Sequence, residues 1–191
     1  GNCLVMGTVP WFAHLVVRNI DWFKHDLVWD KVSPTGPWYA KYRPMGRHEM
    51  IGVFGRKGKC YYDPFVEERP VPIERSYRVG STKVAKNFGN YKRQTNISTH
   101  VFPTTILKYS KRRARNLHSV AKPVELMERL IRMYCPEGGV VLDPFCGSGP
   151  VGAACVNAGR KFILNDLSQE YVDFARSQVD ALLGVELCGV I

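Results

Sequence analysis

The sequence lacks the features of membrane-spanning and exported proteins. No stretch approaches the roughly 18 consecutive apolar residues of a membrane helix, and the first residues do not form a basic-then-apolar export signal. Internal repeats and low-complexity tracts are absent as well. We therefore expect a cytoplasmic protein that has no membrane partner.

The cysteines lack the spacings of metal sites. There is no Cys-x-x-Cys pair and no His-Cys arrangement with the spacing of metal ligands. We interpret the cysteines as reduced thiols, several of them in the core, and we predict no metal site. They are Cys3, Cys60, Cys135, Cys146, Cys155 and Cys188.

Acidic residues are scarce in the middle of the chain. Residues 55–115 contain fifteen Lys and Arg against four acids, a net charge of +11, whereas the whole chain carries +10. Tyr and Phe are interleaved with these basic groups, so phosphate-binding groups lie among rings that can stack on bases. The alternative is a solvated charged loop. The candidate contacts to nucleic acid are Lys83, Lys86, Lys92, Arg93, Lys108, Lys111, Arg112, Arg113 and Arg115.

The first 55 residues alternate between short apolar stretches and polar ones. The pattern predicts strands at 3–7, 25–31 and 49–55 and a helix at 10–19. A loop rich in Pro, Gly and aromatic residues is expected between the last two strands.

Regular patterns are weak in residues 56–117 and return in residues 118–191. The middle segment is rich in proline and polar residues, so we predict loops and short strands there. After it, apolar residues at helical spacing predict a helix whose first turn includes Pro123. A strand, a helix, a strand and a helix follow, at 139–143, 149–157, 161–165 and 168–182. This succession favours an α/β fold with a parallel sheet and right-handed crossovers.

The turn between the first strand and helix of this unit is the candidate binding site. Gly147 and Gly149 allow a sharp turn and a close approach of a ligand to the backbone. With Gly152 they match only part of a dinucleotide fingerprint, because Pro150 follows immediately. The spacing alone therefore leaves the ligand open.

Two acids at the ends of the predicted strands narrow the choice of ligand. Asp143 would repel a pyrophosphate but can pair with an ammonium group, and Asp166 lies where an acid accepts hydrogen bonds from ribose hydroxyls. A ribose and an amine without a phosphate favour S-adenosylmethionine (AdoMet) over NAD. The alternative is an unliganded turn in which Asp166 only caps the next helix.

Three stretches resemble the DNA amino-methyltransferases. "VVLDPFCGSG" (140–149) is similar to their AdoMet motif LDPFxGSGT, and "HSVAKPVELMERLI" (118–131) resembles their HPTQKPxxLLexlI. "WDKVSPTGPWYAKYRPMGRHEMIGVFGRKGKCYYDP" (29–64) resembles a stretch of bacterial and phage adenine methylases. The order of the motifs is similar to that of the circularly permuted beta class.

The resemblance implies a fold, a reaction and a set of residues. The fold would be a Rossmann-like AdoMet-dependent methyltransferase sheet, formed by 1–55 and 118–191, with an inserted, basic, loop-rich target-recognition region at 56–117. The reaction would be methyl transfer to an exocyclic amine in double-stranded DNA, with adenine preferred over cytosine, as in restriction-modification systems of bacteria or phages. The implied AdoMet-binding residues are Lys122, Pro123, Asp143, Phe145, Gly147, Ser148, Gly149 and Asp166, with Phe162 or Leu167 beside the adenine.

The sequence departs from this family at two positions that matter. Pro150 replaces the usual Thr, which removes a hydroxyl and a helix N-terminal amide. The Asp/Asn/Ser-Pro-Pro-aromatic motif that holds the target base is not found, and Thr8–Trp11 is a poor substitute. The catalytic residues are therefore unknown, with His48 and Glu49 as candidates near the base pocket.

The missing motif has a structural consequence under the same resemblance. In the family the motif ends the strand beside the one that ends in Asp143, so the sheet would be incomplete, with two unpaired edges. The chain would be a fragment, half of a split enzyme or a decayed relative. The partner would be a polypeptide that carries the motif, or a second copy of this chain. The alternative functions are a catalytically inactive DNA-binding protein and a methyltransferase that acts on RNA or protein.

Overall fold

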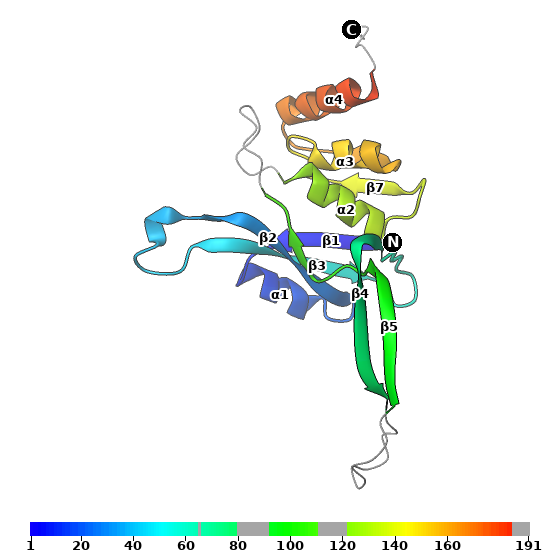
Figure 1. Cartoon of the computed structure of the whole chain (residues 1–191). Coiled ribbons are helices and arrows are strands. Elements are labelled where there is room, and N and C mark those ends of the chain that lie inside the picture. The colour runs from blue at the N-terminus through cyan, green and yellow to red at the C-terminus, as the bar shows by residue number, and fades with distance from the viewer. Residues whose placement is uncertain (65, 80–91, 111–121, 185–191) are drawn as a thin grey trace. The chain divides into compact units, whose positions relative to one another are not determined.

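The computed structural model describes residues 1–64, 66–79, 92–110 and 122–184 (Figure 1). The chain divides into two compact units, which are described separately. The main unit comprises Gly1–Asp63 and Thr104–Ile191, and the hairpin unit comprises Pro64–Pro103.

A four-stranded sheet forms the first part of the main unit. Its strand order is β1-β3-β2-β6, in which β1 and β2 are both antiparallel to β3 and β6 is parallel to β2. The predicted strands are confirmed, but two of them are longer than expected and reach into the predicted loop. The bounds are β1 Asn2–Gly7, β2 Phe23–Thr35, β3 Gly46–Gly55 and β6 Ile106–Lys108.

Helix α1, Trp11–Arg18, lies against this sheet and confirms the predicted helix. Its buried residue, Phe12, lies over β3 at Gly52, where a β-carbon would come within 3.1 Å of the Phe12 ring. The absence of a side chain at Gly52 therefore lets the helix approach the strand.

The core of the main unit forms around helix α2, Val124–Tyr134. Leu126, Leu130 and Met133 are buried on this helix, as its helical spacing of apolar residues requires. They pack in one cluster with buried residues of β2 and β3, among them Trp29 and Ile51, and with residues of α3. Pro123, which was expected in the first turn, is the N-cap of the helix, one residue before its first helical residue, Val124.

The last part of the main unit is the predicted strand-helix-strand-helix succession. β7, Val140–Asp143, pairs in parallel with β8, Lys161–Leu164, and the helix α3, Pro150–Ala158, connects them. Helix α4, Gln169–Leu183, follows and packs on α3. The order of elements predicted after residue 138 is confirmed, with bounds that differ by a residue or so.

The two sheets of the main unit have unpaired edges in the part of the chain that the structure describes. There β7 pairs with β8 alone, and β1 pairs with β3 alone. Val140, Leu142 and Ile163 are also exposed, although all three are large and apolar. One face of the β7-β8 pair is therefore uncovered in the described residues.

The hairpin unit contains two long antiparallel strands, β4 at Glu67–Val79 and β5 at Lys92–Val101. The prediction of loops and short strands is wrong for these residues. Prolines at 70 and 72 suggested a loop, but both lie where the register shifts, between Glu68 and Ile73. A missing N–H is tolerated at such an irregularity, so the prolines do not end the strand.

The described residues contain no helix that is long and apolar enough to cross a membrane. They also contain no group of His, Cys, Asp and Glu side chains that could hold a metal ion. The described cysteines are free thiols, and Cys188 lies outside the described residues.

Candidate functional site

The turn between β7 and α3 owes its shape to two glycines in the left-handed region. Gly147 has φ of 48° and Gly149 has φ of 78°, and Pro150 then begins α3. A β-carbon on Gly149 would lie 2.7 Å from the Ala175 β-carbon on α4, whereas one on Gly147 would meet nothing within 4 Å. Gly149 is thus required for helix packing, and Gly147 leaves open space at the outside of the turn.

The third glycine of the sequence pattern also serves packing. A β-carbon on Gly152 would lie 2.7 Å from Leu164 Cδ1 and 3.0 Å from Val179 Cγ2. Ser148, between the two turn glycines, is buried. The spacing at 147, 149 and 152 therefore reflects the close approach of α3 to β8 and α4 as much as the approach of a ligand.

Asp143 and Asp166 lie at the carboxyl ends of β7 and β8, on either side of the turn. Asp166 accepts hydrogen bonds from the backbone N–H of Gly147, at 2.9 Å, and of Ser168, at 3.1 Å. Asp143 accepts one from the N–H of Phe145, at 3.1 Å. The structure thus brings the two predicted acids together and ties Asp166 to the glycine turn, in addition to its contact with the residue that precedes α4.

The two carboxylates have opposite pKa shifts. Hydrogen bonds from Ser168 and Gly147 lower the pKa of Asp166. Burial raises the pKa of Asp143, and the nearby charge of Asp166 raises it further. An ammonium group beside Asp143 would offset both effects, because it favours the ionised carboxylate.

Apolar surface lies beside these carboxylates. Phe145 is 80% exposed and Leu167 is 100% exposed, although both are large and apolar. Phe162 is partly buried against the core, so of the two residues expected beside an adenine Leu167 is the more accessible. Open space at Gly147, two carboxylates and two exposed apolar side chains fit a ligand with an amine, a ribose and an aromatic base.

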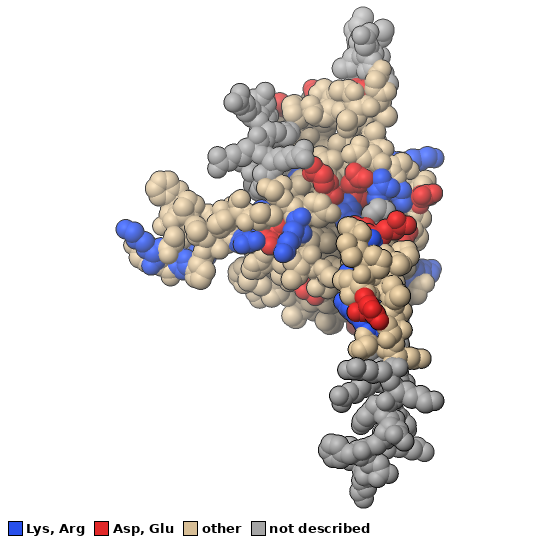
Figure 2. Space-filling view, in the orientation of Figure 1, with Lys and Arg blue, Asp and Glu red and all other residues tan. Residues whose placement is uncertain are grey.

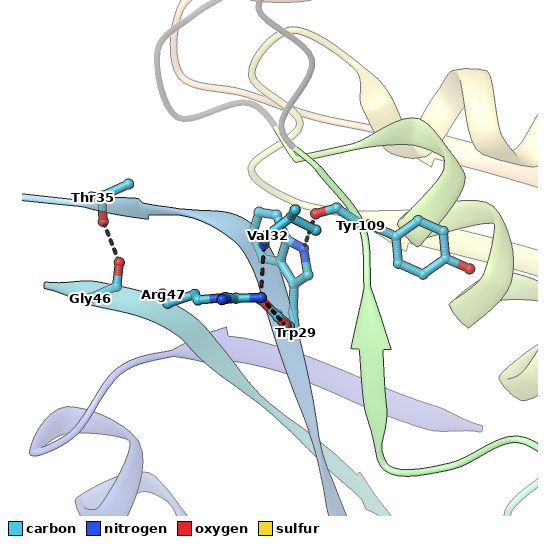
Figure 3. Close-up of polar contacts among 7 residues, drawn as sticks. Trp29, Val32, Thr35, Gly46, Arg47 and Tyr109 are labelled. Carbon is cyan, nitrogen blue, oxygen red and sulfur yellow. Dashed lines mark hydrogen bonds and ion pairs between the residues drawn. The ribbon is translucent and has the colours of Figure 1, made fainter.

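Glu49 lies in an ionic cluster on the buried Trp29. Its two carboxylate oxygens lie 2.6 Å from Lys31 Nζ and 2.5 Å from Lys122 Nζ. Both ammonium groups also lie over the Trp29 ring, at 5.5 and 5.2 Å from its centroid. The indole N–H of Trp29 donates to the carbonyl of Tyr109 at 2.8 Å (Figure 3). The cluster thereby fixes Lys122, the residue just before the Pro123 N-cap of α2.

Glu49 and His48, the two candidate catalytic residues, have different surroundings in the structure. Burial raises the pKa of Glu49, but hydrogen bonds from Lys122 and Lys31 outweigh it, and the pKa is lowered. A carboxylate with both oxygens bound to ammonium groups is a poor proton acceptor, so its contacts favour an anchoring role. His48 is exposed and lies opposite Asp30 in the β2-β3 ladder.

The N-terminus of α2 and the glycine turn lie at the same end of the main unit. Helix α2 ends at Tyr134 and β7 begins at Val140, so the two run in opposite directions along a short connection (Figure 1). Lys122 and Pro123 therefore lie toward the carboxyl end of β7, which is the end that carries Asp143. All of the predicted cofactor-binding residues are found at this end.

The predicted DNA-contact residues are only partly described. Lys108 is exposed on β6, and Lys92 and Arg93 lie on β5. Lys83, Lys86, Lys111, Arg112, Arg113 and Arg115 lie outside the described residues.

Trp29 and Lys31 also belong to the cluster around Glu49, although no sequence motif marks them as parts of the site. They are two residues apart on β2, and Trp29 lies opposite Glu49 in the ladder, so all three side chains share one face. The alternation within the predicted strand at 25–31 was the available signal, but the pairing of this strand with β3 was needed to bring in Glu49.

Comparison with known proteins identifies the family. The fold is that of the AdoMet-dependent DNA methyltransferases, as the solved structures below show. The chain belongs to the DNA methylase family whose model matches residues 6–177.

Curated relatives of this family are matched over about half of their length. The chain is 29% identical over 168 residues to the type II methyltransferase M.Cfr9I of Citrobacter freundii, covering 87% of this chain and 48% of that protein. It is 26% identical over 172 residues to the type II methyltransferase M.SmaI of Serratia marcescens, covering 90% of this chain and 51% of that protein.

Solved structures share the fold. The M1.HpyAVI-SAM complex superposes with a TM-score of 0.64 at 21% identity, covering 94% of this chain and 74% of that chain. The cytosine-N4-specific PvuII DNA methyltransferase superposes with a TM-score of 0.66 at 18% identity, covering 100% of this chain and 66% of that chain.

Proposed function

We propose that this chain supplies the AdoMet- and DNA-binding portion of a DNA methyltransferase that modifies an exocyclic amine. The observation that carries the proposal is the pair Asp143 and Asp166, which flank the glycine turn at the ends of adjacent parallel strands. Ligands of open α/β sheets bind at the carboxyl ends of the strands. Membership of the DNA methylase family and the solved SAM complex of a structural neighbour support the same ligand.

Each residue at this end has a chemical role in the proposal. Asp143 pairs with the ammonium of the methionine part, and Asp166 accepts hydrogen bonds from the ribose hydroxyls. Leu167 packs against the adenine, and Phe145 covers the methionine and ribose side. Gly147, Ser148 and Gly149 line the turn, and Lys122 and Pro123 close the pocket at the α2 N-terminus.

AdoMet supplies a methyl group that is activated by its sulfonium, because breaking the S–CH3 bond releases a neutral thioether. The amine that gains the methyl group then loses one proton, so the protein needs little acid-base chemistry. Its contribution is to position the target amine and to exclude water. The base must leave the duplex, which costs a few kcal/mol. Phosphate contacts from the basic residues of 56–117 would help to offset that cost.

The target base is proposed to be adenine. The support is the resemblance of residues 29–64 to adenine methylases. Cytosine is the second candidate, because the PvuII enzyme, a structural neighbour, is described as cytosine-N4-specific. Mass spectrometry of nucleosides from DNA methylated in vitro decides between them: N6-methyladenine supports the first proposal, and N4-methylcytosine replaces it with the second.

The partner is proposed to be a polypeptide that carries the Pro-Pro-aromatic motif. Among the residues that the structure describes, β1 and β7 each have one unpaired edge, and the side chains of Val140, Leu142 and Ile163 are exposed, which supports this proposal. An added strand would satisfy backbone groups on both edges. Native mass spectrometry of the protein from its own host, with peptide sequencing, should find such a companion. A lone species of about 21.7 kDa would contradict the proposal.

The function itself is tested by labelled methyl transfer from AdoMet to unmethylated DNA, RNA and a protein extract. The enzyme in this assay is the protein purified from its own host, together with any companion polypeptide. We expect labelled DNA alone. Labelled RNA or protein would redirect the proposal to another substrate class. AdoMet binding without transfer to any substrate, together with DNA binding, would favour the inactive DNA-binding protein.

A further inference from the structure

Strands β2 and β3 continue beyond the sheet as an arm, which we define as residues 32–46. The regular ladder ends at the pair Asp30 and His48, and the register is irregular before the next pair, Thr35 and Gly46. Figure 1 shows the two strands extending together past the end of the sheet. The arm belongs wholly to the main unit.

Polar contacts hold the base of the arm in a defined conformation (Figure 3). Arg47 donates from Nε and Nη2 to the two carboxylate oxygens of Asp30, at 2.8 and 3.1 Å. The N–H of Val32, which has φ of 66°, donates to Asp30 Oδ1 at 2.9 Å. Thr35 Oγ1 donates to the carbonyl of Gly46 at 3.1 Å. The base is thus a built feature that constrains the direction of the arm.

The tip of the arm carries exposed aromatic side chains. Trp38 is 88% exposed and Tyr42 is 86% exposed, and Tyr39 and Met45 are exposed as well. A short 3-10 helix at Pro37–Tyr39 presents the first of these rings. Large aromatic side chains in such number at one exposed tip indicate a contact surface.

The charge of the arm has one sign. The sequence has no Asp or Glu between Asp30 and Glu49, whereas the arm contains Lys41 and Arg43. The Arg43 guanidinium lies 5.0 Å from the centroid of the Tyr39 ring, so a cation and an aromatic face are presented together. On the visible face in Figure 2 the outer part of the arm shows basic and uncharged residues without an acidic one.

The arm starts beside the candidate site. Trp29, just before its base, lies under the ammonium group of Lys122 at the N-terminus of α2. That terminus and Asp143 lie at the same end of the main unit. The arm therefore extends from the end at which the target base would have to enter.

We propose that the arm is a second DNA-contact element, separate from the basic segment 56–117. Lys41 and Arg43 contact phosphates, and Trp38 and Tyr42 pack against bases or sugars of the duplex beside the extruded base. The absence of acids and the pairing of cations with rings favour DNA over a protein surface. The inference rests on the proposed DNA methyltransferase function, because a target duplex is its occupant.

The test is equilibrium binding of a fluorescent duplex over a range of salt concentrations. The variants are Lys41→Ala with Arg43→Ala, and Trp38→Ala with Tyr42→Ala. Matched controls are Arg18→Ala with Lys24→Ala, and Trp22→Ala, near the opposite end of β2. The charge variant should reduce the slope of log K against log salt by about 2, since each phosphate contact contributes about 0.9.

The aromatic variant should weaken binding about tenfold or more at one salt concentration and leave the slope unchanged. Trp38→Phe alone should keep most of the wild-type affinity, because an aromatic ring remains at this position. Thermal unfolding of each variant verifies that it is folded, and exposed positions should leave the midpoint close to that of the wild type.

Two results would overturn the arm proposal while the proposed function stands: folded arm variants that bind DNA like the wild type, or variants that lose only a protein companion in native mass spectrometry. A wild-type protein that binds no duplex, alone or with its companion, would reject the proposed function and the arm proposal with it.

Discussion

The glycine turn of the main unit and the strands of the hairpin unit are held by different forces. At the turn, residues distant in sequence meet: Gly147 donates to Asp166, and Gly149 packs on Ala175. In the hairpin unit the described side chains are mostly exposed, as Ile97 at 63% illustrates, and the backbone ladder joins β4 to β5. Side-chain packing organises the first region, and backbone pairing organises the second.

This difference explains why one region is visible in the sequence and the other is hidden. Packing, and in the proposal ligand contacts, demand particular residue types, so glycines and acids at fixed spacing mark the turn. A ladder uses N–H and C=O groups that nearly every residue has, so it leaves little trace in an exposed hairpin. Substitutions in the two regions should therefore have very different costs.

Gly149→Ala should have the largest effect, because it breaks the packing that defines the turn. Its φ of 78° costs a side chain about 1–2 kcal/mol, and the new methyl group, 2.7 Å from the Ala175 β-carbon, costs about 1–3 more. Urea unfolding should show a loss of about 2–5 kcal/mol. Gly159→Ala, with φ of 67° and nothing within 4 Å, is the control and should show the conformational cost alone. Equal losses would mean that the turn is not sterically restrained.

Asp166→Ala should come next, and it tests the proposed ligand at the same turn. The variant removes a carboxylate that binds Gly147 and, in the proposal, the ribose. A charged carboxylate is a stronger hydrogen-bond acceptor than a neutral group, so affinity for S-adenosylhomocysteine should fall about 10- to 100-fold in calorimetry. Asp173→Ala, an exposed carboxylate on α4, is the matched control. Unchanged affinity in Asp166→Ala would remove this residue from the cofactor site.

Glu49→Gln should cost about 2 kcal/mol at neutral pH, because it leaves two ammonium groups beside a buried indole without a carboxylate. The pKa of Glu49 is lowered from 4.5, so its contribution is present above that value and is lost as pH falls through the lower folded pKa. The difference in unfolding free energy between wild type and variant should therefore shrink below about pH 4.5. Glu137→Gln, at an exposed position, controls for charge. A difference that is independent of pH would contradict the ionic role.

Ile97→Thr in the hairpin unit should have the smallest effect, within about 0.5 kcal/mol in urea unfolding. The side chain is exposed, and threonine keeps the β-branched shape that strands favour. Ile51→Thr, fully buried in the main unit, should cost at least about 2 kcal/mol. Similar losses at both positions would show that the hairpin unit has a core of its own and would end the contrast between the regions.

Much of the main unit could be predicted from the sequence. The pattern of apolar residues predicts α2, α3 and the strands around them, and it places the acids at 143 and 166 at strand ends. The β4-β5 hairpin could not be predicted in this way, because Pro70 and Pro72 indicated a loop and the register irregularity that accommodates them is a property of the paired strands.

The sequence by itself determined the order of elements after residue 138 and the location of the glycine turn, because periodicity and glycine conformations are local properties. Only the tertiary structure decided that Gly149 faces Ala175, that Glu49 lies between Lys31 and Lys122, and that the arm starts beside this cluster. These contacts join segments far apart in the chain. Their partners are chosen by strand register and helix packing, which no local pattern specifies.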